Sequence, residues 1–73
     1  MNEVAAIGAQ QHVAGFALAG THAYVAHTDD EARAAWRALP KAVAVVILSE
    51  EAAAAIGDDR IAPQAPLTVV MPA

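Results

Sequence analysis

Residues 42–48, with the sequence AVAVVIL, form an unbroken apolar run dominated by β-branched side chains. A strand with one face in water would alternate apolar and polar residues, and this run shows no such alternation. The run therefore predicts a central strand of a parallel sheet, covered on both of its faces. Parallel strands need long crossover connections, usually helices, so the run indicates an α/β fold.

Three further apolar segments predict strands, and helical segments separate the four strands from one another. The predicted strands span residues 4–7, 21–27, 42–48 and 67–71. The predicted helices run from Gln10 or Gln11 to Gly20, from Thr28 to the residue before Pro40, and from Ser49 to about Ile56. A polar, proline-rich loop is expected over residues 58–66. The order βαβαβαβ with right-handed crossovers predicts one domain over residues 1–73, with a four-stranded parallel sheet of order 2-1-3-4 and three crossover helices, similar to flavodoxin or receiver domains.

Two helix starts carry clear capping signals. Thr28 with Glu31 fits a capping box, in which a hydroxyl accepts from the backbone N–H three residues on. Ser49 is expected to cap the third helix in the same way, with Glu50 and Glu51 in the first turn. Acids at these positions complement the positive amino-terminal end of a helix, so both starts are well specified.

The first helix is apolar on nearly every side. Val13 and Phe16 belong to the stripe expected to face the core, yet Ala14 and Leu18 leave the opposite side apolar too. In the order 2-1-3-4 this helix is alone on its face of the sheet. We expect part of that face, and the free edge of the fourth strand, to stay exposed unless another chain covers them.

The composition excludes several classes of protein. The chain has no cysteine, which excludes disulfides and thiolate metal sites. The formal net charge is −4 and the four basic residues are scattered, so nucleic acid is not an expected partner. No apolar run reaches the length of a membrane span, and no signal peptide is recognisable, so we expect a cytoplasmic protein without direct membrane insertion.

The turn after the first strand lacks phosphate-binding chemistry. Residues 8–12, GAQQH, offer neither clustered glycines nor a lysine followed by a hydroxyl. A receiver domain would carry acids after its first strand and an aspartate after its third, where this chain has Ala9 and Ser49. Gly8, Gly15 and Gly20 match no dinucleotide fingerprint and are interpreted as turn and close-packing residues.

Other candidate sites are equally weak. The histidines His12, His22 and His27 have neither the spacing nor the carboxylate neighbours of a metal site. Ser49 and His27 could meet at adjacent strand ends, but no third orienting group is apparent and capping explains Ser49. Asp58 and Asp59 are interpreted as turn residues. We therefore expect no catalytic, cofactor-binding or metal-ligating residue and no bound cofactor.

The segment from Ile7 to Trp36 carries a family resemblance. A strand ending in Ile-Gly leads to a helix that closes with Gly15, Phe16, Leu18, Ala19 and Gly20, followed by Thr28 and Glu31 at the next helix start. With the valine-rich strand and acidic helix start of residues 45–51 and the proline-bounded strand of residues 66–72, this resembles the N-terminal domain of the F subunit of V/A-type rotary ATPases. The resemblance covers essentially the whole chain.

The resemblance implies a non-catalytic subunit of a central rotor stalk. Members of this family bind the coiled-coil shaft subunit among other subunits of the rotary ATPase. They help to couple ATP turnover to proton or sodium transport, and the nucleotide sites belong to other subunits. The family's fold agrees with the four-stranded α/β prediction, and its members are cytoplasmic, peripheral parts of a membrane-associated complex.

The chain departs from the family pattern in two respects. Ala9, Gln10 and Gln11 stand where acidic residues are common, and the sequence lacks the usual C-terminal tail that follows the last strand. No role of that tail is carried over. An alternative interpretation therefore stays open, that of a free-standing α/β interaction module that self-associates through its exposed sheet face or edge, as a homo-oligomer.

Overall fold

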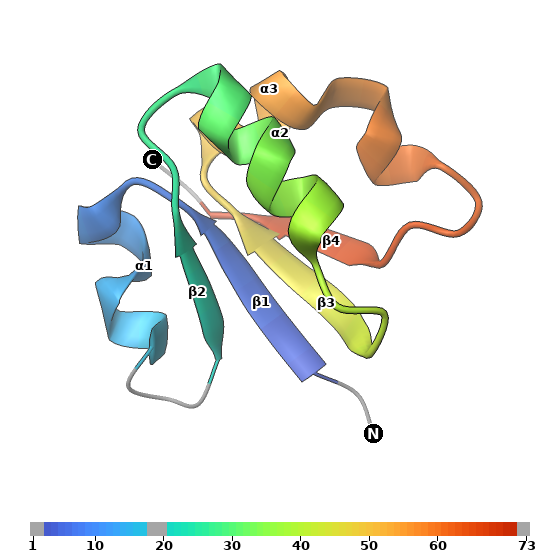
Figure 1. Cartoon of the computed structure of the whole chain (residues 1–73), viewed down its shortest axis with the longest axis horizontal. Coiled ribbons are helices and arrows are strands. Elements are labelled where there is room, and N and C mark those ends of the chain that lie inside the picture. Colours follow the sequence, from blue (N-terminus) through green and yellow to red (C-terminus); the bar gives the residue numbers. More distant parts are fainter. Residues whose placement is uncertain (1–2, 18–20, 72–73) are drawn as a thin grey trace.

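The computed structural model describes residues 3–17 and 21–71, without the side chains of residues 12, 16 and 17. Within this part of the chain the fold is a four-stranded, all-parallel sheet with helical connections (Figure 1). The elements are β1 (Glu3–Gly8), α1 (Gln10–Ala17), β2 (His22–Val25), α2 (Asp29–Ala38), β3 (Val43–Leu48), α3 (Glu50–Ile56), the 3-10 helix η1 (Gly57–Ile61) and β4 (Leu67–Val70).

The strand order is β2-β1-β3-β4, which confirms the predicted order 2-1-3-4. The two outer strands of this order are β2 and β4. In register, Ala5 pairs with Val46 and Ile7 with Leu48. A bulge near the start of β1 places Val43 opposite Glu3 and Val45 opposite Val4, which leaves Ala44 as the extra residue.

The main core lies between the sheet and the layer formed by α2 and α3. Its largest side chains are Ile7, Val46 and Leu48, each 0% exposed. The remaining contacts are made largely by alanines, on the strands as well as on both helices: Ala5, Ala26, Ala32, Ala52 and Ala53. Because alanine fills little volume, the helices lie close to the sheet.

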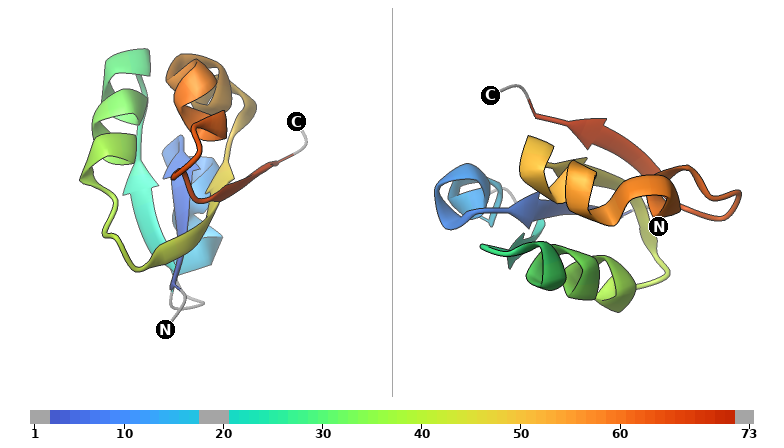
Figure 2. Two further views of the ribbon diagram at one scale, coloured as in Figure 1. Left: turned by 90° about the vertical axis from the view of Figure 1, so that its right-hand side faces the viewer. Right: turned by 90° about the horizontal axis from the view of Figure 1, so that it is seen from above.

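The apolar side of α2 packs around this core. Ala32 is buried, and Ala35, Trp36 and Leu39 are partly buried against the core cluster. α1 lies on the opposite face of the sheet from α2 and α3, which run side by side (Figure 2). Val13 of α1 is only 1% exposed, which marks the contact of α1 with the sheet.

Most described element boundaries lie within one residue of the sequence prediction, and two segments differ by more. The segment after α3 was expected to be a plain loop, but its first five residues form η1. A single 3-10 turn is too short to leave a periodic pattern, which explains why the sequence did not indicate it. β2 is also shorter than residues 21–27, because only His22–Val25 pair with β1. The expected end of the first helix at Gly20 lies outside the described residues.

Candidate interaction surface

Four apolar side chains of β3 and β4 share the sheet face opposite α2 and α3. They are Val45, Ile47, Leu67 and Val69, and we call them the β3–β4 apolar face. The register pairs Val45 with Leu67 and Ile47 with Val69, so the four form one contiguous patch. Leu67 is 67% exposed and Val69 is 50% exposed. Exposed apolar patches of this kind are typical of protein interaction sites.

The position of α1 explains why this patch is open. α1 packs mainly against β2 and β1, at the end of the sheet remote from β4 (Figure 1). On β1 the residue facing α1, Ala6, is 0% exposed, whereas Val45 and Ile47 on β3 are only partly buried. The expectation that residues 42–48 are covered on both faces is therefore wrong for one face. The apolar run predicts a central strand correctly but does not reveal how far a neighbouring helix reaches.

β4 also presents the exposed edge that the strand order predicts. Its one hydrogen-bonded neighbour in the described part of the chain is β3, and the backbone N–H of Met71 donates to the Leu48 carbonyl at 2.7 Å. Among the described residues the exposed large apolar side chains are Val25, Ile61, Leu67, Val69 and Val70. Most of them belong to β4, so exposure of apolar surface is concentrated on this strand.

The outer side of α1 is the second surface that the sequence indicated. Ala14 and Gly15 are exposed, in agreement with an apolar helix side that does not face the core. The side chain of Phe16 and residues 18–20, which carry most of the family signature, lie outside the described residues.

A small cleft opens at the carboxyl ends of the strands. It has a volume of about 160 Å³ and is lined by the residues that follow β1, β2 and β3, among them Ala9, His27, Thr28 and Ser49. Ser49 is buried, and its hydroxyl accepts from the backbone N–H of Ala52 at 3.1 Å. The structure thus brings His27 and Ser49 to the same cleft, with Ser49 engaged as the predicted helix cap.

The electrostatics of this cleft disfavour phosphate. Three helices begin at this end of the sheet, which would attract an anion, but two of them, α2 and α3, begin with acidic residues. The carboxylate-bearing side chains of Asp29 and Glu51 line the cleft itself. A phosphate would meet two negative charges, and the chain offers no lysine or arginine in the lining to offset them.

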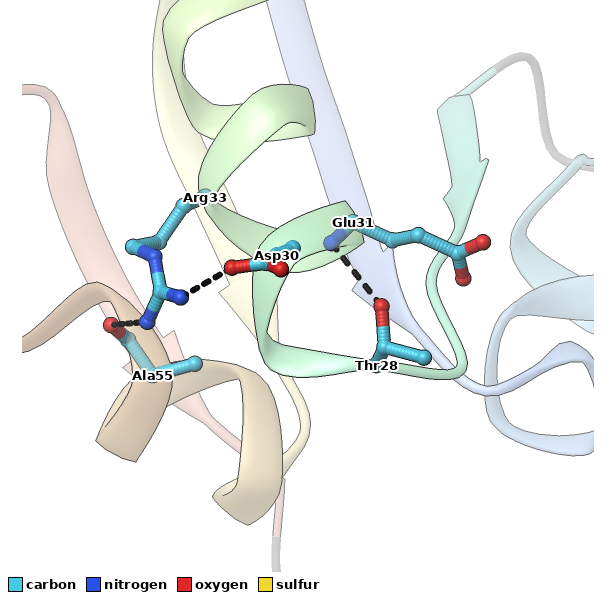
Figure 3. A network of polar contacts seen from close by, with 5 residues as sticks. All are labelled: Thr28, Asp30, Glu31, Arg33 and Ala55. Atoms are coloured by element: carbon cyan, nitrogen blue, oxygen red, sulfur yellow. Dashed lines mark hydrogen bonds and ion pairs between the residues drawn. The ribbon is translucent and has the colours of Figure 1, made fainter.

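The start of α2 shows how its acids are used (Figure 3). The Thr28 hydroxyl accepts from the Glu31 backbone N–H at 3.1 Å. The Glu31 carboxylate in turn accepts from the backbone N–H of His27 at 2.7 Å. This confirms the predicted capping box, with the carboxylate bound one residue before the cap. Arg33 pairs with Asp30 and donates to the Ala55 carbonyl at 3.4 Å, which joins α2 to α3.

The two histidines whose side chains are described, His22 and His27, do not lie in one site. The His22 side chain on β2 is hydrogen-bonded to the Glu3 carboxylate on β1, whereas His27 lies beyond the opposite end of β2. Over residues 3–17 and 21–71, so far as the side chains are described, no three His, Asp or Glu side chains are grouped as metal ligands. The side chain of His12 lies outside the description.

A second hollow, at the amino-terminal ends of the strands, was not anticipated from the sequence. It has a volume of about 610 Å³ and lies between the end of α2 and the segment before β4. Trp36, Leu39 and Pro66 contribute much of its apolar lining. These residues come from segments far apart in the chain, so no local pattern could have indicated the hollow.

The comparisons with known proteins give one family. The model of the family described as ATP synthase (F/14-kDa) subunit matches residues 4–72. The match includes all of α1, all of the β3–β4 apolar face and the whole sheet apart from Glu3. No curated protein matches the sequence. None of the helices described here is long and apolar enough to cross a membrane.

Proposed function

Since the chain belongs to the family of F (14-kDa) ATP synthase subunits, we propose that it is a non-catalytic component of a central rotor stalk. In this proposal it binds the coiled-coil shaft subunit of a V/A-type rotary ATPase or ATP synthase. It helps to couple ATP turnover in the catalytic head to proton or sodium transport. Its place is on the cytoplasmic side, as a peripheral part of the membrane-associated complex.

The β3–β4 apolar face is the observation that carries the proposal. A long helix of a coiled coil can present an apolar stripe along its side. Leu67 and Val69 offer the exposed apolar contacts that such a stripe requires, with Val45 and Ile47 beside them as partly buried floor. No charged side chain belongs to this face, so an apolar stripe can pack on it without burying an unpaired charge.

The cleft at the strand ends supports a role without nucleotide chemistry. Asp29 and Glu51 make it unfavourable for phosphate, and Ser49 is used to hold a helix start. A coupling subunit needs no nucleotide site of its own when other subunits bind ATP. The protein's task in the proposal is therefore to bind and to transmit load.

The test is binding to a co-expressed shaft subunit, measured by isothermal titration calorimetry. Leu67→Glu places a charge in the centre of the contact and should weaken binding by more than about tenfold. Ile61→Glu is the matched control, because Ile61 is 76% exposed but lies on η1, outside the β3–β4 apolar face. The proposal fails if the wild-type chain does not bind the shaft, or if both variants bind as it does.

A further inference from the structure

We propose that β4 pairs antiparallel with β4 of a second copy of this chain, about a two-fold axis that passes through Val69. This pairing joins two four-stranded sheets into one continuous sheet. It concerns the chain on its own and does not depend on the proposed rotor function. The argument rests on which backbone groups of β4 face outward, on their symmetry, and on the absence of charge at this edge.

The hydrogen bond from Met71 to Leu48 fixes the direction of every backbone group along β4. In a parallel strand, residues alternate between directing both N–H and C=O toward one neighbour and directing both toward the other side. Met71 faces β3. Thr68 and Val70 therefore direct their N–H and C=O groups away from β3, to the unpaired edge.

Prolines limit the pairing at both ends of this edge. Pro66 precedes the strand and Pro72 follows it in the sequence, and neither residue has an N–H to donate. The outward donors available between them are those of Thr68 and Val70. The carbonyls of the same two residues also face outward, and a symmetric partner should pair all four groups, because each buried polar group left unpaired costs about 1–3 kcal/mol.

Only one symmetric register pairs both outward N–H groups and both outward C=O groups of Thr68 and Val70. With the axis at Thr68, Val70 lies opposite Pro66 of the second copy, and with the axis at Val70, Thr68 lies opposite Pro72. In each case both N–H groups still find an acceptor, but one carbonyl of β4 faces a proline, which cannot donate. With the axis at Val69, Thr68 lies opposite Val70 of the second copy, and the two residues exchange both of their N–H···O=C bonds. The prolines thus favour the register in which every outward N–H and C=O of Thr68 and Val70 is paired.

The side chains agree with this register. Val69 lies opposite Val69 of the second copy, and Leu67 lies opposite Met71, at positions where paired side chains approach most closely. Each of these pairs is apolar. Val69 and Leu67 are 50% and 67% exposed in the single chain. Both gain cross-strand contacts where the two β4 strands meet, a contact that we call the seam.

The charge distribution favours a second copy over a charged partner. The sequence carries no charged residue after Arg60, whereas the net charge of the chain is −4. The acids of α2, α3 and η1 lie on elements other than β4. Two copies can therefore meet at β4 without placing like charges opposite each other. The seam is short, so we expect dissociation constants in the micromolar range or weaker, as for small interfaces.

Disulfide trapping tests the register directly, because the natural chain has no cysteine. In the proposed pairing the two copies of residue 69 form a non-hydrogen-bonded pair with Cα atoms about 4.5 Å apart, within disulfide range. Val69→Cys should form disulfide dimers at least about tenfold faster than Leu67→Cys under mild oxidation, because the two copies of residue 67 are well beyond disulfide reach. Equal rates for the two variants would overturn the proposal.

The unmodified chain gives the second test. Analytical ultracentrifugation should show a concentration-dependent dimer, which Thr68→Pro abolishes by removing an outward donor without touching the bonds to β3. Val25→Pro is the matched control on β2, at the other edge of the sheet, where dimerisation should persist. Circular dichroism verifies that both variants fold. A wild-type chain that stays monomeric at millimolar concentration, or a Thr68→Pro chain that folds and still dimerises, contradicts the proposal.

Discussion

Gly8 at the end of β1 lies against Ser49, so that a Cβ atom on Gly8 would stand 3.0 Å from the Ser49 Cβ and 3.1 Å from its Oγ. Ser49 is itself fixed, since its hydroxyl caps α3 and its backbone N–H donates to the Ile7 carbonyl at 3.1 Å. The ends of two adjacent strands therefore leave no room for a side chain at position 8. The glycine serves packing in this turn.

Gly8→Ala should lower the free energy of unfolding by about 1–3 kcal/mol, because the added methyl group overpacks a buried site. Gly15→Ala is the matched control, since a Cβ there meets nothing within 4 Å and the residue lies within α1. That change should raise the free energy of unfolding by about 0.5–1 kcal/mol. Urea denaturation of both variants measures the difference, and equal destabilisation would contradict the account of Gly8.

Ser49→Ala should lower the free energy of unfolding by about 1–2 kcal/mol, since the Ala52 N–H loses its acceptor in a buried place. Thr28→Ala removes the corresponding cap of α2, where water can replace the hydroxyl. We expect a smaller loss there, of about 0.5–1 kcal/mol. Thermal denaturation compares the two, and a larger effect at Thr28 would argue against burial as the cause.

Leu48→Ala should lower the free energy of unfolding by about 2–5 kcal/mol, because Leu48 is 0% exposed in the main core. Leu67→Ala should change it by less than about 0.5 kcal/mol, since that side chain is 67% exposed. The same substitution at two leucines thus distinguishes a core position from a position on an interaction surface. Comparable losses in a denaturant titration would show that Leu67 is buried in solution.

Arg33→Ala should cost more stability than Asp30→Asn, although the two side chains form one ion pair. Asp30 is 90% exposed in its side chain, so its change should cost less than about 0.5 kcal/mol. Arg33 is less exposed and also donates to the Ala55 carbonyl, so the loss of its bond and its stem should cost about 1 kcal/mol. If denaturant titration gives equal values, the bond to Ala55 contributes nothing.

The sequence predicted those features that short-range chemistry determines. The caps at Thr28 and Ser49 follow from residues within one helical turn. The sheet order follows from the buried run at residues 42–48 and from the handedness of crossovers. Both arguments need only the residues nearby and rules that hold for every such fold.

Most of the features that were not predicted depend on contacts between segments that lie far apart in the sequence. The exposure of Val45 and Ile47 on one face follows from where α1 packs, which no strand pattern contains. The hollow near Trp36 and Pro66 joins segments that are separate in sequence. η1 is too short to give a periodic pattern of apolar residues in the sequence. The expectation that Phe16 packs in the core stays a prediction, since its side chain lies outside the described residues.

The alanine-rich layer under α2 and α3 has a mechanical consequence. Ala5, Ala32, Ala52 and Ala53 have no side-chain torsion that can switch between rotamers, so the joint between helices and sheet has few alternative packings to move into. A force applied at β4 would therefore displace the helices with the sheet and would do little to repack the layer between them. We expect such a body to behave as a stiff link, with its compliance confined to its loops and its edges.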